Sequence, residues 1–207
     1  MTEKAYQFWN NLIGWTLFGL ALLTFGSTVE PTASYWDCAE YIATSAKLQV
    51  GHPPGAPFFQ MMGAFFASFA SSTEKIALMV NYMSVFSSAF TILFLFWTLT
   101  LILRKIPSFS GLESLSQKIG FFGSAAVGAM AFCFSDSFWF NAVEAEVYAM
   151  AMFLLALLFW MGLRWESEMN TPRGDRWLLL MAFIIGLCFG VHFMALLTIP
   201  SLGMLYY

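Results

Sequence analysis

Charged residues are scarce in this sequence of 207 residues. Asp, Glu, Lys and Arg together make up 10% of the chain, whereas hydrophobic residues make up 59% and aromatic residues 19%. The mean hydropathy is +0.72. A water-soluble domain of this size cannot bury so large an apolar fraction. The composition therefore predicts an all-α polytopic membrane protein whose apolar helices are long enough to cross a bilayer.

Several motifs are also missing. Cys38, Cys133 and Cys188 are an odd number of cysteines without a CxxC pair, so neither a disulfide framework nor a zinc site is supported. The sequence has no GxGxxG or Walker loop, which a nucleotide-driven pump would need to hold its phosphates. No internal repeat or low-complexity tract divides the chain. We predict a single transmembrane domain over residues 1–207, and we expect it to be the N-terminal portion of a longer protein because it stops at Tyr206-Tyr207 just after an apolar segment.

Five apolar segments are predicted to span the membrane. They are residues 12–29, 76–103, 119–134, 147–163 and 177–199. The segment 58–70 is apolar but has only about 13 residues, fewer than the roughly 20 that a spanning helix needs. We predict that it is a re-entrant or interfacial helix.

The positions of the cations set the predicted orientation. If the segment 58–70 does not cross and the N-terminus is cytoplasmic, seven of the nine Lys and Arg residues lie inside and only Lys47 and Lys75 lie outside. If that segment crosses, three of the seven cations move outside and the bias is lost. We therefore predict a cytoplasmic N-terminus and an acidic external face. The predicted external acids are Glu30, Asp37, Glu40, Glu74, Asp136, Glu144 and Glu146.

Polar chemistry is concentrated in the first external loop, residues 31–57. If residues 35–50 form a helix, four polar side chains fall within roughly an 80° wedge at 100° per residue, opposite an apolar side. This pattern predicts an amphipathic helix on the membrane surface that ends at Gly51. A second interpretation stays open, because Ser34-x-x-Asp37 also has the spacing of a capping box. The wedge consists of Asp37, Glu40, Thr44 and Lys47.

A second polar loop follows the third span. Glu144, Glu146 and Tyr148 lie there, and Glu146 comes immediately before a long apolar run. An acid at the mouth of a span is a functional candidate, although it can also complement the positive end of a helix. His192 is predicted at about 22 Å along the last span, in its outer half. It is either a hydrogen-bonded packing residue or part of the floor of an external cavity.

These segments carry a resemblance. Trp36-Asp-Cys-Ala-Glu40, the run from Lys47 through His52-Pro-Pro to Pro57, the run from Phe138 to Tyr148, and the run Gly186-Leu-Cys-Phe-Gly-Val-His192 look like a bacterial membrane-protein family that is similar to the protein O-mannosyltransferases. That resemblance implies a GT-C-like transmembrane helical bundle, of which this chain is the N-terminal part. It also implies the bacterial inner membrane as the location and a periplasmic active site.

The resemblance implies a glycosyltransferase that moves a sugar, expected to be mannose, from a polyprenyl-phosphate donor to a protein Ser or Thr hydroxyl. Asp37 is assigned as the general base, with Glu40 beside it to orient the acceptor or raise basicity. Lys47 and His52 are assigned to the donor phosphate. The remaining candidates, which would close the cavity, are Glu144, Glu146, Tyr148 and His192.

Other classes stay open. Transfer to a lipid or a polysaccharide would use the same residues, and a non-catalytic transport or assembly subunit would explain the apolar bulk. No metal is predicted as a requirement, but a divalent cation of the Mg or Mn type would find oxygen ligands at Asp37, Glu40 and Glu146. The predicted partners are the lipid-linked donor and a protein or lipid acceptor, and no nucleic acid.

Overall fold

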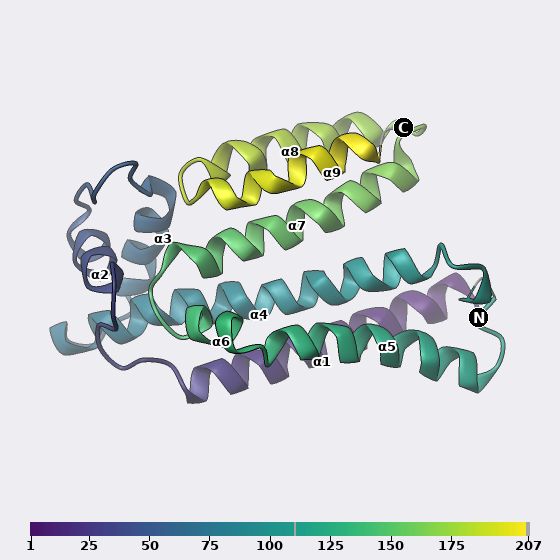
Figure 1. Ribbon diagram of the computed structural model, residues 1–207, viewed down its shortest axis with the longest axis horizontal. Coiled ribbons are helices and arrows are strands. Elements are labelled where there is room, and N and C mark those ends of the chain that lie inside the picture. The colour runs from purple at the N-terminus through teal and green to yellow at the C-terminus, as the bar shows by residue number, and fades with distance from the viewer. Residues whose placement is uncertain (110, 206–207) are drawn as a thin grey trace.

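The computed structural model describes residues 1–109 and 111–205, and these residues contain helices and connecting segments but no strand (Figure 1). The prediction of an all-α bundle is confirmed. The α-helices are α1 (Glu3–Ser27), α2 (Cys38–Lys47), α3 (Pro57–Ala67), α4 (Ile76–Leu103), α5 (Leu115–Cys133), α6 (Asp136–Ala142), α7 (Val147–Glu168), α8 (Gly174–Cys188) and α9 (Thr198–Met204). The 3-10 helices are η1 (Thr73–Lys75), η2 (Pro107–Phe109) and η3 (Phe193–Leu197). The prediction of a longer protein was based on Tyr206 and Tyr207, and these two residues lie outside the described residues.

Three helices are long and apolar enough to cross a membrane: α1, α4 together with η1, and α7. They overlap or contain the predicted spans 12–29, 76–103 and 147–163. The predicted span 119–134 corresponds to α5, which passes the same test as a pair with α6 and is bent from it by 67°. α4 has 28 residues, so it is about 42 Å long, which exceeds the roughly 30 Å of a hydrocarbon core.

Residues 177–199, predicted as one span, do not form a continuous helix. α8 ends at Cys188 after 15 residues. The chain then turns, and the backbone amides of Val191 and His192 both bond to the Cys188 carbonyl. η3 and α9 follow and run back in the opposite direction (Figure 1). The predicted short segment 58–70 forms α3, whose 11 residues reach about 16 Å, and α3 lies beside α2 at one end of the bundle (Figure 1).

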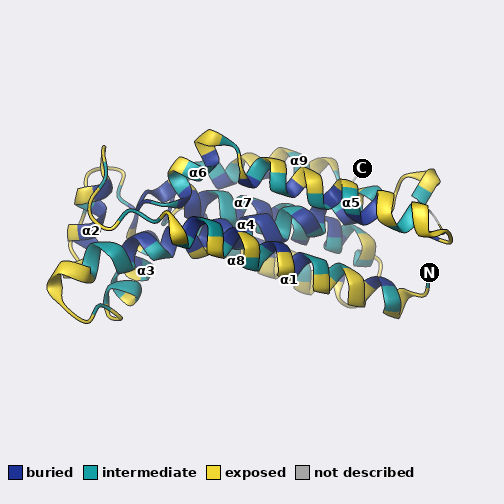
Figure 2. Cartoon of the chain, turned by 90° about the horizontal axis from the view of Figure 1, so that it is seen from below, coloured by how far each residue is buried: buried dark blue, intermediate teal, exposed yellow. Residues whose placement is uncertain are grey.

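α4 is the central helix because it contributes to both apolar cores. Val80 and Met83 pack with α2, α3, α7 and α8, whereas Ile92 and Phe96 pack with α1, α5 and α6. Figure 2 shows the burial concentrated on α4 and α7, while α1 and α8 expose much of their surface. These exposed surfaces are apolar, as the exposed Leu23 of α1 illustrates. The outer faces therefore suit contact with lipid.

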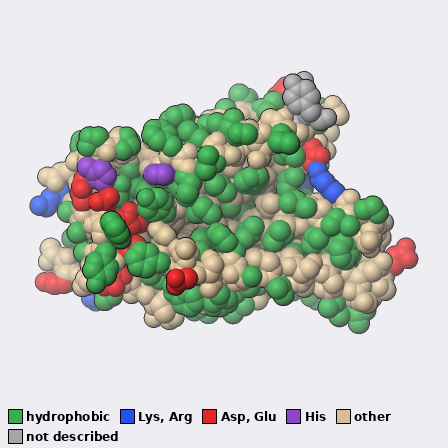
Figure 3. Space-filling model, viewed as in Figure 1, with side chains coloured by type: hydrophobic (Ala, Val, Ile, Leu, Met, Phe, Trp, Pro, Cys, Tyr) green, Lys and Arg blue, Asp and Glu red, His purple; other side chains and the backbone are tan. Residues whose placement is uncertain are grey.

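The two ends of the bundle differ in charge, as the sequence predicts. One end holds the N-terminus and the ends of α4 and α7, and the other end holds α2, α3 and α6 (Figure 1). The first end carries seven cations and five carboxylates, a net charge of +2, and the second carries two cations and seven carboxylates, a net charge of −5. Figure 3 shows carboxylates and both histidines gathered at the second end.

A hydrogen bond between segments distant in sequence fixes the turn after α8. α3 begins at Pro57, and Ala56 at its N-cap has no side-chain acceptor for the first free amides. The Gly190 carbonyl takes that role, because the amides of Phe58 and Phe59 donate to it at 2.8 and 3.1 Å. A Cβ atom on Gly190 would lie 2.8 Å from the Cβ of Phe58. Glycine at this position therefore allows α3 to approach the turn.

Replacing Gly190 with alanine should lower the free energy of unfolding by about 1–3 kcal/mol, because the new methyl group overlaps Phe58. Gly186→Ala is the matched control, since a methyl group there has nothing within 4 Å. That control should be neutral or stabilise by up to about 1 kcal/mol, as alanine favours a helix over glycine. The measurement is the melting temperature of the purified protein in detergent. Equal melting temperatures for the two variants would contradict the packing described at Gly190.

Candidate functional site

α2 carries the first site residues, and it is shorter than predicted. The helix covers residues 38–47 instead of 35–50, because Trp36 and Leu48 adopt positive φ angles of 58° and 49° that end a right-handed helix. Leu48, not Gly51, is therefore the C-cap. The capping box that starts at Ser34 is not formed, because the N-cap of α2 is Asp37 and not Ser34, and the Asp37 side chain makes no capping hydrogen bond. That carboxylate is thus available for other contacts.

The buried side of α2 differs from the predicted one. Cys38, Tyr41 and Ile42 face the core, but Thr44 is buried as well, although it belongs to the predicted polar wedge. The reason is that α3 packs against this side and supplies a polar partner: Gln60 Nε2 donates to Thr44 Oγ1 at 2.9 Å. The Thr44 hydroxyl in turn donates to the Glu40 carbonyl at 2.8 Å.

Asn81 of α4 anchors the loop that leads into α2. Its side chain is fully buried, and its Nδ2 group donates to the carbonyls of Glu30 at 2.6 Å and Thr32 at 2.8 Å. The Cys38 thiol lies 3.9 Å from Asn81 Oδ1. One amide group therefore satisfies two loop carbonyls and contacts the first residue of α2.

Asp37, Glu40 and His52 form a compact cluster. The His52 backbone amide donates to Glu40 Oε1 at 2.6 Å, and His52 Nδ1 lies 3.1 Å from Glu40 Oε2. These contacts with His52 hold the pKa of Glu40 below its ordinary value. His52 Nε2 lies 3.8 Å from Asp37 Oδ2. The imidazole of His52 is therefore placed between two carboxylates.

A cavity of about 150 Å³ opens next to this cluster. It brings together residues from α2, from the loop before α3, from the start of α7 and from the turn after α8. The predicted site residues among its lining are Asp37, His52, Glu146, Tyr148 and His192. Apolar walls, including Phe189 and Val191, complete it. Five of the eight predicted site residues thus meet at one cavity.

Glu146 is the most deeply buried acid of the cavity. It is the N-cap of α7 and is 5% exposed. Burial, and next the negative charge of Asp37, raise the pKa of Glu146 to about 7, although backbone amides of Asp37 and Val147 act in the opposite direction. Its Oε1 atom has no hydrogen-bond partner among the described residues. The carboxyl group therefore holds its proton up to near neutral pH.

His192 and Tyr148 also line the cavity. His192 was predicted inside the last span, but the structure places it at the N-cap of η3. Its Nδ1 accepts a hydrogen bond from the Met194 amide at 3.1 Å. An accepting Nδ1 has no proton, so the proton of the neutral ring is on Nε2. The rings of Tyr148 and His192 lie 5.3 Å apart.

Three predicted residues lie outside the cavity lining. Glu40 contacts it through His52. Glu144 is 2% exposed; burial raises its pKa, and contact with the Ser34 hydroxyl partly offsets this. Lys47 is exposed at the other end of α2, ten residues after Asp37, which corresponds to about 15 Å along the helix.

Tyr41 is a cavity residue that the sequence reasoning missed. It is 8% exposed and lines the cavity with Asp37. Burial, and then the charges of Glu146, Asp37 and Glu40, raise the pKa of Tyr41 to about 12, so its hydroxyl remains a hydrogen-bond donor. Its position four residues after Asp37, on the same face of a helix, is the signal that could have identified it.

The cluster also contains groups that could hold a divalent cation. One ligand atom from each of Asp37, Glu40 and His52 can be chosen so that all three lie within 4.8 Å of one another. Glu146 was predicted as the third ligand beside Asp37 and Glu40, but the structure groups His52 with these two carboxylates instead. Two carboxylates and an imidazole suit Mn²⁺ or Zn²⁺ better than Mg²⁺, which favours oxygen ligands.

Comparison with known proteins gives one family. Residues 37–207 match the family described as the N-terminal domain of protein O-mannosyl-transferase TMEM260. The chain is similar to a protein from Dictyostelium discoideum named protein O-mannosyl-transferase tmem260, with 25% identity over 162 residues. This alignment covers 78% of the chain but only 18% of that relative. No solved structure matches the chain.

The raised pKa of Glu146 predicts a pH-dependent stability. Between its ordinary value of 4.5 and about 7, the carboxyl group ionises in the unfolded chain but keeps its proton in the folded one. Stability should therefore fall as pH rises through this interval, by an amount on the order of 2 kcal/mol. Glu146→Gln cannot ionise, so its melting temperature should rise relative to that of the wild type between pH 4.5 and pH 8.

Glu113→Gln, at an exposed carboxylate of the other end, is the control and should follow the wild type at both pH values. A constant difference between Glu146→Gln and the wild type across this interval would show that Glu146 does not titrate there.

Proposed function

Because this chain belongs to the family of the N-terminal domain of protein O-mannosyl-transferase TMEM260, we propose that it forms the active-site end of a membrane glycosyltransferase. The proposed reaction moves mannose from a polyprenyl-phosphate donor to a Ser or Thr hydroxyl of a protein. The observation that carries the proposal is the cavity at which Asp37, His52, Glu146 and His192 meet at the acidic end of an apolar bundle. A lipid-linked donor can place its sugar there while its chain stays in the bilayer.

Asp37 is the proposed general base. Its side chain is 56% exposed, so an acceptor can reach it, and it makes no capping bond that would occupy its oxygens. In the proposed step the acceptor oxygen attacks the anomeric carbon, its proton moves to Asp37, and the bond from that carbon to the phosphate oxygen breaks. The electron pair leaves with the polyprenyl phosphate. A single displacement of this kind inverts the anomeric configuration.

The two histidines are the proposed phosphate contacts. A phosphate is already a good leaving group, so it needs positive charge or hydrogen-bond donors more than a strong acid. Glu40 holds His52 in place through two hydrogen bonds. The His192 ring, with its proton on Nε2, can donate to a phosphate oxygen.

Glu146 has a different proposed role. A third ionised carboxylate close to Asp37 and Glu40 would repel an anionic donor. Because burial raises its pKa to about 7, Glu146 carries its proton in part of the population at neutral pH and lowers this repulsion. Lys47, assigned from the sequence to the donor phosphate, lies too far along α2 to support that assignment from its position.

The proposed orientation follows from charge. The basic end, with seven of the nine cations, faces the cytoplasm, and the acidic end with the cavity faces the opposite side, in agreement with the positive-inside rule. The fold implied by this proposal is of the GT-C type. A bacterial origin stays a prediction, and the similar protein described above comes from Dictyostelium discoideum.

A transport function has less support. A polar path across the membrane would need ionisable groups along the spans. α4 has no Asp, Glu, Lys, Arg or His between Ile76 and Leu103, α1 has such residues only at Glu3 and Lys4, and those of α7 begin at Arg164. Transfer to a lipid or polysaccharide stays an alternative for the acceptor, and the experiment below separates it from transfer to protein.

Asp37→Asn should reduce sugar transfer by about 10²–10⁴-fold, since the variant keeps the shape of the side chain but cannot accept a proton. The assay uses membranes that contain the full-length protein, radiolabelled polyprenyl-phosphate mannose and a protein extract as the acceptor. The control is Asp136→Asn, because Asp136 is an exposed acid at the same end that does not line the cavity.

Label in protein with the wild type and the control, but not with Asp37→Asn, is the expected result. Label found in lipid alone would show that the acceptor is a lipid and not a protein. Full transfer by Asp37→Asn would refute the base assignment, and no transfer by any form would count against this donor.

A further inference from the structure

Another cavity, lined by both charged and apolar side chains, lies at the opposite end of the bundle, where α7 is followed by α8. Its volume is about 290 Å³, and it is lined by Arg164, Glu168, Arg173, Arg176, Trp177 and Leu180. Arg164, which lines this cavity, follows Glu146 by 18 residues along α7, which corresponds to about 27 Å of helix. The arginine cavity, as we call it, therefore has no part in the proposed transfer reaction.

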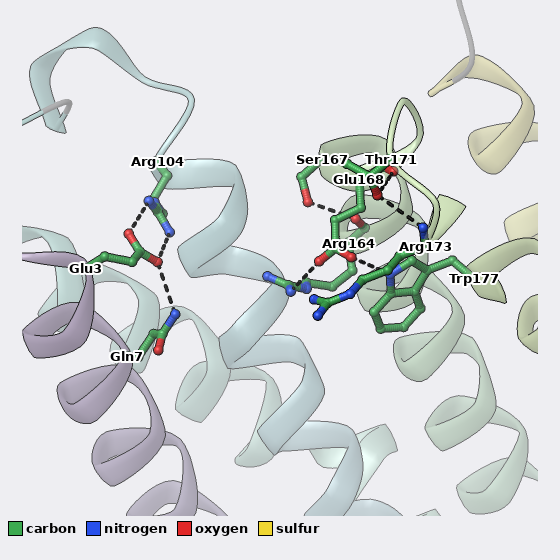
Figure 4. A network of polar contacts seen from close by, with 9 residues as sticks. All are labelled: Glu3, Gln7, Arg104, Arg164, Ser167, Glu168, Thr171, Arg173 and Trp177. Atoms are coloured by element: carbon green, nitrogen blue, oxygen red, sulfur yellow. Dashed lines mark hydrogen bonds and ion pairs between the residues drawn. The ribbon is translucent and has the colours of Figure 1, made fainter. Parts of the chain in front are cut away.

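The cavity wall has more positive than negative charge. Glu168 accepts hydrogen bonds from Arg164 at 2.8 Å and from Trp177 Nε1 at 3.2 Å, so both of its oxygens are engaged (Figure 4). Arg173 and Arg176 are exposed and have no carboxylate partner among the described residues. Three guanidinium groups thus surround one carboxylate, a surplus of two positive charges.

The guanidinium groups of Arg164 and Arg173 reach toward the same space in Figure 4, and both residues line the cavity. Like charges on the lining of one cavity repel each other, and an anion between them offsets this repulsion. Planar guanidinium groups match the oxygens of a phosphate with paired hydrogen bonds. The arrangement therefore suits a phosphate group.

An apolar surface continues directly from the cavity. Trp177 and Leu180 belong to its wall, and the neighbouring Leu179 and Phe183 of α8 are 72% and 61% exposed. Tryptophan is common where a membrane protein meets the headgroup region. A soluble anion would explain the arginines but would not use this surface, whereas a phospholipid has a chemical group for each part.

We propose that the arginine cavity binds the headgroup phosphate of an anionic membrane phospholipid. Arg164, Arg173 and Arg176 hold the phosphate, and the acyl chains lie along the exposed side of α8 at Leu179 and Phe183. In the orientation set by the positive-inside rule, this lipid belongs to the cytoplasmic leaflet. It occupies the leaflet opposite to the one from which the proposed donor enters.

The test measures lipid binding without any transfer reaction. The full-length protein in detergent is titrated with phosphatidylglycerol and with phosphatidylcholine, and bound lipid is counted by native mass spectrometry. The variant Arg173→Ala with Arg176→Ala should bind phosphatidylglycerol roughly thirtyfold more weakly, because each basic side chain near a headgroup contributes about a fivefold factor. The lysine form of the same pair, Arg173→Lys with Arg176→Lys, keeps the charge but loses the paired hydrogen bonds, so its affinity should lie between those of the wild type and the alanine variant.

The matched control is Lys4→Ala with Lys118→Ala, which removes the same charge from the same end of the bundle outside the cavity. It should bind phosphatidylglycerol like the wild type. If Lys4→Ala with Lys118→Ala lost as much affinity for phosphatidylglycerol as Arg173→Ala with Arg176→Ala, the proposal would be overturned in favour of general surface attraction. Equal affinity of the wild type for both lipids would overturn it too, as would competition by millimolar inorganic phosphate that displaces all bound lipid.

Discussion

The position of the candidate site depends on the buried side-chain amide of Asn81, which donates hydrogen bonds to two carbonyls of the loop before α2. An apolar bundle offers few hydrogen-bond partners, and an unpaired carbonyl buried there costs about 1–3 kcal/mol. Asn81, which is buried near the start of α4, supplies two donors, and the carbonyls of Glu30 and Thr32 accept both hydrogen bonds. The loop between α1 and α2 is thereby tied to α4, and Asp37 is brought to the start of α7, where Glu146 lies.

The charged side chains of this chain lie at the two ends of the bundle, and those in its middle that are polar are uncharged, such as Ser88 and Thr91 of α4. At one end the carboxylates and histidines share a cavity, and at the other end arginines surround Glu168. The apolar length of α4 and α7 separates them, so neither set of charges influences the other strongly across more than two Debye lengths. This separation lets one end carry the proposed transfer site while the other end carries the proposed phospholipid site.

Hydropathy was sufficient to predict α1, α4 and α7, because long apolar runs have no other stable arrangement in a bilayer. The scarcity of charge also identified Asp37, His52 and Glu146, which meet at the cavity. Tertiary contacts decided the rest. The break after Cys188 depends on a carbonyl that caps a distant helix, and the burial of Thr44 depends on Gln60, so neither has a periodic signal in the sequence.

The Gly190 carbonyl accepts the first two amides of α3, and this sharing has a structural consequence. His52 lies five residues before α3, and His192 lies two residues after Gly190. Each histidine is therefore on a segment that begins close to the contact between Gly190 and α3. The loop that carries His52 and the turn that carries His192 are thus joined at one hydrogen-bonded junction. The spacing of the two histidines that line the cavity therefore depends on backbone contacts that neither side chain makes.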